Sequence, residues 1–189
     1  MFPMDTSDHA TRLRNILLRA PHVMAALRAV RTLALPDWAI GAGFIRSAVW
    51  DHLSGLPVSP VDDIDVLYFD PADLTWAPEE HAETALSRLA PGLPWSVRNQ
   101  ARMHLRKNDA PYRSTEDAMH YWLETPTCAA VRLEADDALT VMAPFGLADL
   151  FARCIRPTPR GRLYVAEYRE RLERKAWQRR WPGITVEWP

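Results

Sequence analysis

Two carboxylates separated by one residue, Asp63 and Asp65, are side chains that could do chemistry. Apart from Asp65, residues 64–69 are apolar, β-branched or aromatic, which is typical of a buried strand. Because strand side chains alternate with a period of two, both carboxylates would lie on one face. Two like charges there repel each other and lose hydration unless a cation lies between them. The spacing therefore predicts a metal site, and oxygen ligands of this kind suit Mg²⁺ or Mn²⁺.

A plainer explanation of the pair stays open. Residues 57–60 form a proline-bounded turn, and a solvated strand entry after it would leave Asp62 and Asp63 exposed without any metal. A motif as short as Asp-x-Asp carries a high risk of a false positive. The residues upstream of the pair favour the metal site.

A glycine turn upstream could hold phosphate. A short apolar run at residues 38–40 leads into Gly41 and Gly43, and residues 44–53 have apolar side chains at helical spacing. Strand, glycine turn and helix start, in that order, aim backbone amides and the positive end of a helix dipole at an anion. Arg46 lies one turn into this helix and could add charge-assisted hydrogen bonds to a triphosphate; a surface ion pair is the alternative.

Helices and strands are expected to alternate, with a hairpin late in the chain. Apolar residues at helical spacing predict helices over residues 9–31 with a break at Pro21, 44–53, 78–90, 115–122, 147–154 and 160–180. Apolar or alternating runs predict strands over residues 38–40, 64–69, 96–105, 127–133 and 139–142. This order indicates an α+β fold, with a small mixed, largely antiparallel sheet covered by helices mainly on one face.

The strand predicted over residues 96–105 has one fully polar face. That face could be an outer edge in water or the floor of a polar cleft. In a cleft, Arg102 and His104 would be contacts to phosphate or to an acceptor.

Length and composition are those of a globular protein. The 189 residues fit one domain, and 48% are hydrophobic and 25% charged. Within this single domain (1–189) we expect a helical cover over residues 1–36, a core over residues 37–157, and a basic helix and tail over residues 158–189.

The chain shows no signal for a membrane or for zinc. Its apolar runs are far shorter than the ~20 residues that cross a bilayer, and residues 1–9 lack a secretory pattern, so we expect a cytoplasmic protein. Cys128 and Cys154 are expected to be reduced, and neither they nor the six His have the spacing of zinc ligands.

Charge is distributed unevenly along the chain. Residues 1–50, 51–150 and 151–189 carry net charges of +3, −10 and +6. A helix over 160–180 would bury Val165, Tyr168, Leu172 and Ala176, and would leave outward Arg162, Arg169, Arg171, Arg174 and Lys175. These cations could guide RNA or another polyanion to the acidic middle segment, or could simply be solvated.

The glycine turn and the two carboxylates together resemble a known family. The run Gly-Ala-Gly-Phe-Ile-Arg at residues 41–46, followed by Asp-Ile-Asp-Val at 63–66, resembles the nucleotidyltransferase signature of the DNA polymerase β superfamily, as found in tRNA-nucleotidyltransferase head domains. Ala42 takes the place of one of the paired glycines, and Ser47 the place of an Asp. Residues 38–157, including 95–104 and 143–146, also resemble a family of small bacterial nucleotidyltransferase-like proteins.

This resemblance implies the nucleotidyltransferase fold and a metal-dependent enzyme. Asp63 and Asp65 would hold Mg²⁺ or Mn²⁺, and Gly41, Gly43 and Arg46 would position an NTP, whose nucleoside monophosphate passes to an acceptor such as RNA. The family normally adds a third carboxylate as general base. Asn99 occupies the first position expected for it, and Glu124 and Glu134 are the remaining options. Without that base, the chain would be a catalytically silent nucleotide-binding or regulatory module.

A competing enzyme class is the haloacid-dehalogenase-like phosphatases. These enzymes have an apolar strand that ends in Asp, as residues 66–70 do, with a second Asp two positions later. Here that later position is Ala72, which weighs against this class.

Overall fold

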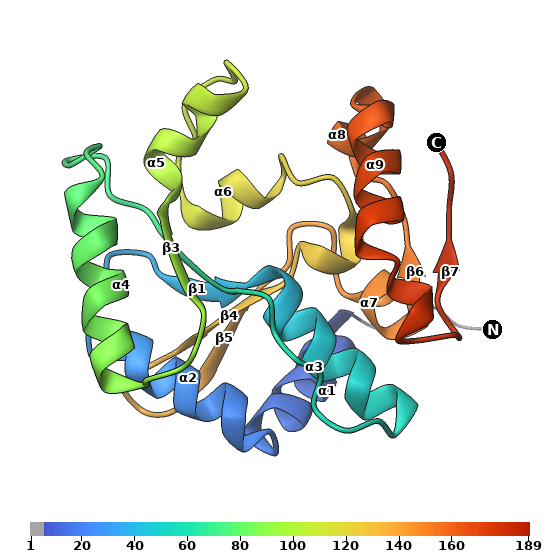
Figure 1. Cartoon of the computed structure of the whole chain (residues 1–189), viewed down its shortest axis with the longest axis horizontal. Coiled ribbons are helices and arrows are strands. Elements are labelled where there is room, and N and C mark those ends of the chain that lie inside the picture. The colour runs from blue at the N-terminus through green and yellow to red at the C-terminus, as the bar shows by residue number, and fades with distance from the viewer. Residues whose placement is uncertain (1–5) are drawn as a thin grey trace.

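The computed structural model describes residues 6–189, so the first five residues of the predicted helical cover lie outside the described part (Figure 1). The α-helices are α1 (Thr6–Leu18), α2 (Pro21–Arg31), α3 (Ala42–Ser54), α4 (Ala77–Leu89), α5 (Gln100–Met103), α6 (Thr115–Met119), α7 (Ala148–Ala152), α8 (Pro159–Leu163) and α9 (Val165–Lys175). The strands are β1 (Ala39–Gly41), β2 (Ile64–Tyr68), β3 (Trp95–Asn99), β4 (Ala130–Leu133), β5 (Leu139–Met142), β6 (Cys154–Ile155) and β7 (Thr185–Val186). Short 3₁₀ helices cover His104–Arg106, Thr125–Thr127 and Trp177–Arg179.

The main sheet has the strand order β3-β2-β1-β4-β5. Strands β2 and β3 run parallel, and the other neighbours in this sheet run antiparallel. The predicted α+β class with a small, largely antiparallel sheet is therefore confirmed. Ile40 of β1 pairs with Val66 of β2, and this antiparallel register places Gly41 beside Asp65.

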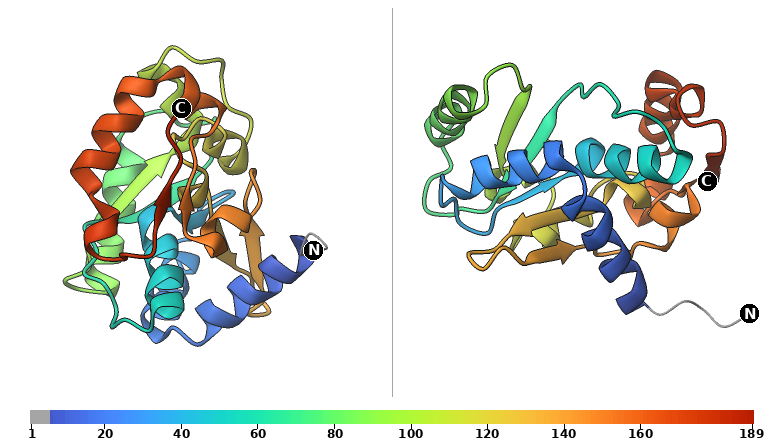
Figure 2. Two further views of the ribbon diagram at one scale, coloured as in Figure 1. Left: turned by 90° about the vertical axis from the view of Figure 1, so that its right-hand side faces the viewer. Right: turned by 90° about the horizontal axis from the view of Figure 1, so that it is seen from below.

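The helices form two groups around the main sheet. Helices α1, α2 and α3 lie together at the bottom of Figure 1, whereas α5, α6, α8 and α9 stand at the top. Figure 2 shows α4 and α9 at opposite ends of the molecule. The main core contains fully buried side chains from both layers, including Leu27, Ile45 and Val66. No helix of the described residues is long and apolar enough to span a membrane.

The C-terminal segment is fastened to α3. The rings of Trp177 and Trp181 meet that of Trp50 edge-on, at centroid distances of 6.4 and 5.2 Å. The buried carboxylate of Asp51 accepts hydrogen bonds from the Trp181 indole (2.9 Å) and from the backbone N–H of Ser59 (2.6 Å). These contacts hold the segment after α9 against α3.

The predicted strand over residues 96–105 is wrong beyond Asn99. The Asn99 side chain accepts the N–H of Ala101 at 3.0 Å, and so caps α5 and ends the strand. The same side chain donates to the backbone carbonyls of Asp70 and Asp73, which fixes it to the loop after β2. Arg102 and His104 therefore lie on helical turns, not on a strand face.

The predicted continuous helix over residues 160–180 is also wrong. The chain leaves the helical conformation at Tyr164 and again at Ala176, whose φ of 42° is left-handed. The outward positions predicted for Arg171 and Lys175 are wrong too, because both side chains are only partly exposed, at 28% and 29%, and pair with Glu124 and Asp62.

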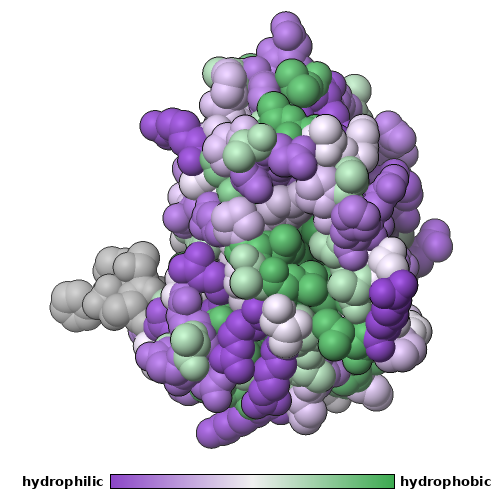
Figure 3. Space-filling view, turned by 90° about the vertical axis from the view of Figure 1, so that its left-hand side faces the viewer, coloured by the Kyte–Doolittle hydropathy of each residue, from purple (hydrophilic) through white to green (hydrophobic). Residues whose placement is uncertain are grey.

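The side of the molecule on which α4 lies carries a central hydrophobic patch with polar surroundings (Figure 3). Leu74 and Leu89, next to and within α4, are exposed. Neither lines the two cavities described below.

Candidate active site

The turn between β1 and α3 contains two glycines with different surroundings. A Cβ added at Gly41 would lie 3.0 Å from Cβ of Ala130 and 3.2 Å from Leu67, so a side chain there would crowd the neighbouring strands. A Cβ at Gly43 would meet only a terminal nitrogen of Arg46, at 3.5 Å. Packing therefore does not require glycine at position 43, and the backbone there is open to a close approach. Ala42, between them, has a left-handed φ of 56°.

Arg46 is buried, with 5% exposure, so the surface ion pair considered for it is wrong. Its Nη1 donates to Oγ1 of Thr127 at 3.1 Å, and its guanidinium lies over the rings of Trp50 and Trp177. Its Nε has no hydrogen-bond partner among the described residues. Burial lowers the pKa of Arg46 to about 10, opposed mainly by Glu124, so the side chain stays charged at neutral pH.

Asp63 and Asp65 have different environments at the start of β2. Asp63 is exposed, and Asp65 is half-buried. Burial and then the neighbouring Asp63 raise the pKa of Asp65 to about 6, against the opposing effect of Arg171, Arg98 and Lys175. Within residues 6–189, neither carboxylate has a hydrogen bond or ion pair from a side chain. A half-buried carboxylate of raised pKa beside another free carboxylate is a fit for a divalent cation.

Each of these carboxylates lines a cavity. The first, about 480 Å³, lies between α5–α6 and α8–α9 and is lined by Asp65, Thr127, Glu124 and Arg171 together with aromatic side chains, namely Tyr112, Tyr121 and Trp122. The second, about 310 Å³, is lined by Gly43, Arg46, Ser47, Asp63 and Lys175, among others. The hydrogen bond from Arg46 to Thr127 connects the walls of the two cavities.

Glu124 is one of the two acidic side chains that the sequence left open as the third carboxylate. It is 2% exposed and lines the first cavity. Its Oε1 accepts from Thr127 Oγ1 at 2.9 Å and from Arg171 Nε at 2.7 Å. Glu134 instead lies in the hairpin turn and pairs with Arg132. The signal in the sequence was that Glu124 is the single charge within the otherwise uncharged residues 121–131.

Arg102 and His104 are not brought to the carboxylates. Arg102 forms a bidentate ion pair with Glu79 of α4, at 2.8 and 2.6 Å, and its guanidinium lies 3.3 Å from the Trp76 ring centroid. His104 packs edge-on against Tyr112, and its buried Nδ1 has no partner among the described residues. Neither side chain lines either cavity.

Asp70, on which the phosphatase alternative depends, lies outside the two cavities. Its carboxylate accepts the N–H of Ala72 in a turn. Among residues 6–189, no three His, Cys, Asp or Glu side chains are grouped closely enough to hold a metal by themselves. Glu124 is therefore not joined to Asp63 and Asp65 in one ligand cluster.

Comparison with known proteins gives consistent matches. A family described as nucleotidyltransferase matches residues 28–186. An NMR structure described as revealing a CCA-adding enzyme head domain is 30% identical, with a TM-score of 0.81, over 95% of this chain and 96% of that chain. These matches confirm the predicted nucleotidyltransferase fold and the resemblance to tRNA-nucleotidyltransferase heads.

Larger enzymes share the fold at lower identity. A CCA-adding enzyme in complex with CTP is 17% identical, with a TM-score of 0.57, over 97% of this chain and 43% of that chain. An apo tRNA-processing enzyme is 16% identical, with a TM-score of 0.53, over 99% of this chain and 45% of that chain. This chain thus spans less than half of these two proteins. No curated protein matches the sequence.

Proposed function

The chain belongs to this nucleotidyltransferase family, and we propose that it transfers a nucleoside monophosphate from an NTP to an acceptor at Asp63 and Asp65. One observation carries the proposal: of two carboxylates without side-chain partners in residues 6–189, Asp63 lines a cavity at a helix N-terminus and Asp65 lines a second, aromatic-walled cavity. This arrangement offers one place for a triphosphate and another for an acceptor, with acidic ligands between them.

The triphosphate would bind in the second cavity. Helix α3 is 13 residues long, and its first amides have no partners within the helix, so its N-terminus attracts anions. Arg46 adds a buried charge whose Nε is free to donate. Gly43 leaves room for a phosphate oxygen near the backbone.

Asp63 and Asp65 would hold Mg²⁺ or Mn²⁺ together with phosphate oxygens, because two carboxylates plus substrate phosphates are a usual set for these ions. When bound, the ion would neutralise charge on the leaving pyrophosphate and polarise the α-phosphorus. Arg46 and the α3 amides would meanwhile orient the phosphate chain, which is most of what catalysis of this transfer requires.

The acceptor would bind in the first cavity, beside Asp65 and Glu124. Glu124 is the candidate for the general base, and the acceptor hydroxyl would give its proton to this carboxylate as the oxygen attacks the α-phosphorus. RNA, whose terminal hydroxyl could enter the cavity, is one acceptor of suitable chemistry.

A silent nucleotide-binding module is the second candidate function. The observation that favours it is the ion pair of Glu124 with Arg171, since a carboxylate held at 2.7 Å by a guanidinium is a poor base. A silent module would bind Mg²⁺ and NTP as tightly as an enzyme and would transfer nothing.

Calorimetric titration of NTPs with and without Mg²⁺ tests the proposed site. We expect binding that needs Mg²⁺ in the wild type and is lost in the double variant Asp63→Asn with Asp65→Asn. Asp136→Asn is the matched control, because Asp136 is exposed in the turn between β4 and β5 and lines neither cavity. Unchanged binding in the double variant would remove Asp63 and Asp65 from the site.

A further inference from the structure

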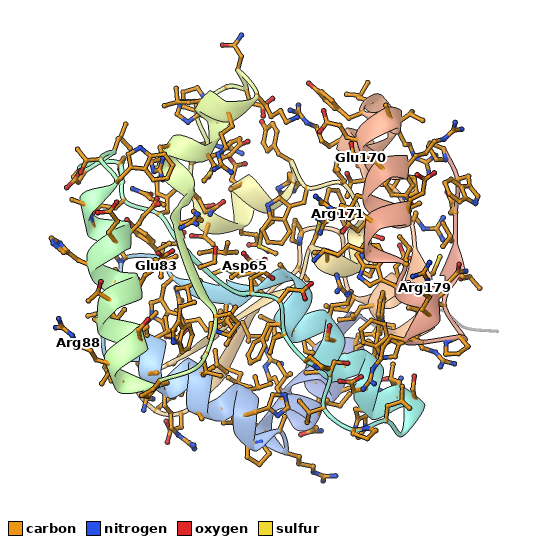
Figure 4. The ribbon with its side chains drawn as sticks, viewed as in Figure 1. Asp65, Glu83, Arg88, Glu170, Arg171 and Arg179 are labelled. Carbon is orange, nitrogen blue, oxygen red and sulfur yellow. The ribbon has the colours of Figure 1, made fainter. Side chains whose placement is uncertain are left out.

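Helix α9 presents two cations to the candidate site from the C-terminal part of the chain. Tyr168 and Leu172 are buried against the domain, and Arg171 and Lys175, one turn apart, lie beside this buried stripe. Arg171 lines the first cavity with Asp65, and Lys175 lines the second cavity with Gly43, Arg46 and Asp63. Figure 4 shows Arg171 on the side of α9 that faces Asp65.

Arg171 and Lys175 differ in their ion-pair partners. Arg171 binds the buried Glu124, so it has a structural task. Among the described residues, the side chain of Lys175 forms a hydrogen bond and ion pair with Asp62 alone, at 3.0 Å, and the Asp62 side chain is 80% exposed. An ion pair of this kind contributes little to stability, because solvent screens it. The position of Lys175 in the cavity wall is therefore not explained by folding.

We propose that Lys175 is a phosphate-binding residue of the NTP site, which makes the C-terminal helix part of that site. This inference rests on the proposed function and extends it to a segment outside the glycine turn and the Asp-x-Asp strand. The ligand group is the polyphosphate chain, whose charge selects triphosphates over monophosphates.

Charge in the second cavity supports this role. Asp62 and Asp63 line it, so an approaching triphosphate meets two negative charges there in addition to nearby Asp65. Arg46 and the α3 N-terminus oppose them. Lys175 and Arg180 also line this cavity, and Arg180 is already held by the carbonyl of Pro57 and by Ser59. Lys175 is thus the cation that can exchange an exposed carboxylate for phosphate oxygens.

The backbone holds Lys175 in this position. The left-handed Ala176 directly after it turns the chain so that Trp177 packs beneath Arg46, at 4.6 Å from the guanidinium to the ring centroid. Lys175 and Arg46 therefore line the same cavity and are linked through Trp177.

The test compares Lys175→Met, which keeps the apolar stem and removes the charge, with Arg174→Met on the exposed side of the same helix. Calorimetry with Mg²⁺ is done for ATP, inorganic tripolyphosphate and AMP, and melting temperatures check the fold. We expect Lys175→Met to weaken the binding of ATP and of tripolyphosphate by the same factor, about tenfold, because one charge-assisted hydrogen bond is lost. AMP binding should not change, and Arg174→Met should behave as the wild type.

The possible outcomes separate this inference from the proposed function. Wild-type protein that binds neither ATP nor tripolyphosphate would contradict the proposed function, and the inference with it. Wild-type binding that is equal in Lys175→Met and Arg174→Met would overturn the role of Lys175 alone. An equal loss for AMP and ATP in Lys175→Met would also overturn it, because a general change of the pocket would then be the cause.

Discussion

At the scale of single residues, Gly41 and Gly43 have different tasks: Gly41 serves strand packing, and Gly43 serves the proposed phosphate site. Gly41 has little space for a side chain, whereas Gly43 has space and lines the cavity proposed for the triphosphate. The same substitution at the two positions should therefore have opposite consequences.

We expect Gly43→Ala to fold with a stability equal to or up to about 1 kcal/mol above that of the wild type, because alanine favours a helix. NTP affinity should fall, since the new methyl group occupies the approach of the phosphate. Gly41→Ala, the matched control, should lose about 1–3 kcal/mol through overpacking. Chemical unfolding and NTP titration of both variants measure this, and full NTP affinity in Gly43→Ala would contradict the phosphate site.

Asp65 should make stability depend on pH. Its pKa rises from 3.8 to about 6 on folding, so the folded state binds more protons than the unfolded state between about pH 4 and pH 6. The free energy of unfolding contributed by this group therefore falls as pH rises through that window. We expect Asp65→Asn to remove this slope, as measured by denaturant unfolding across the window in the absence of metal.

Asp62→Asn is the control for this measurement, since Asp62 is exposed. Mg²⁺ should raise the melting temperature more at pH 7.5 than at pH 5, because the carboxylate must be ionised to bind it. A slope that is the same in Asp65→Asn and in the wild type would show that Asp65 is not the titrating group.

At the scale of elements, the sequence predicted those that depend on local signals. Pro21 at the start of α2 and the left-handed Gly55 at the end of α3 mark their helices locally. The hairpin of β4 and β5 and the strand carrying Asp65 also follow from short apolar runs.

The elements that were missed depend on contacts distant in sequence. Asn99 ends β3 because its side chain binds the loop at residues 70–73, and Arg102 turns to Glu79 of α4. Arg171 faces inward because it meets Glu124, 47 residues away along the chain. Periodicity alone carries no information about such partners, so Glu124 could be named as an option but not placed.

The attachment of the C-terminal segment to α3 should depend on Asp51. Its buried carboxylate accepts from Ser59 and Trp181 and lies 3.6 Å from Arg180. We expect Asp51→Ala to lower the free energy of unfolding by about 3 kcal/mol, because buried donors lose their acceptor. Asp62→Ala should stay within about 1 kcal/mol of the wild type. Equal losses in the two variants, measured by urea unfolding, would contradict this role of Asp51.

At the scale of the whole molecule, the basic tail is mostly neutralised within the fold. Arg160, Arg162, Arg171 and Lys175 pair with Asp109, Glu187, Glu124 and Asp62. Among the described residues, Arg169, Arg174 and Arg179 are exposed cations of the tail without a carboxylate partner. A polyanion would therefore find about three free positive charges on the tail.

We expect weak RNA retention that falls with salt, with a logarithmic slope of about −2 for three phosphate contacts to a single strand. The combined variant Arg169→Ala, Arg174→Ala and Arg179→Ala should abolish it, as measured by filter retention of bulk RNA at increasing salt. Equal RNA retention by this variant and by the wild type would place any RNA contact on another surface.

The central claim is transfer of a nucleoside monophosphate at Asp63 and Asp65, and labelled transfer tests it most directly. The protein is incubated with α-³²P-labelled NTPs, Mg²⁺, and total cellular RNA, protein or small-molecule extract, beside the double variant Asp63→Asn with Asp65→Asn. We expect the wild type to pass label to one of these acceptors and the double variant to pass none. Wild-type protein that retains labelled NTP yet labels no acceptor would contradict the claim and identify a silent nucleotide-binding module.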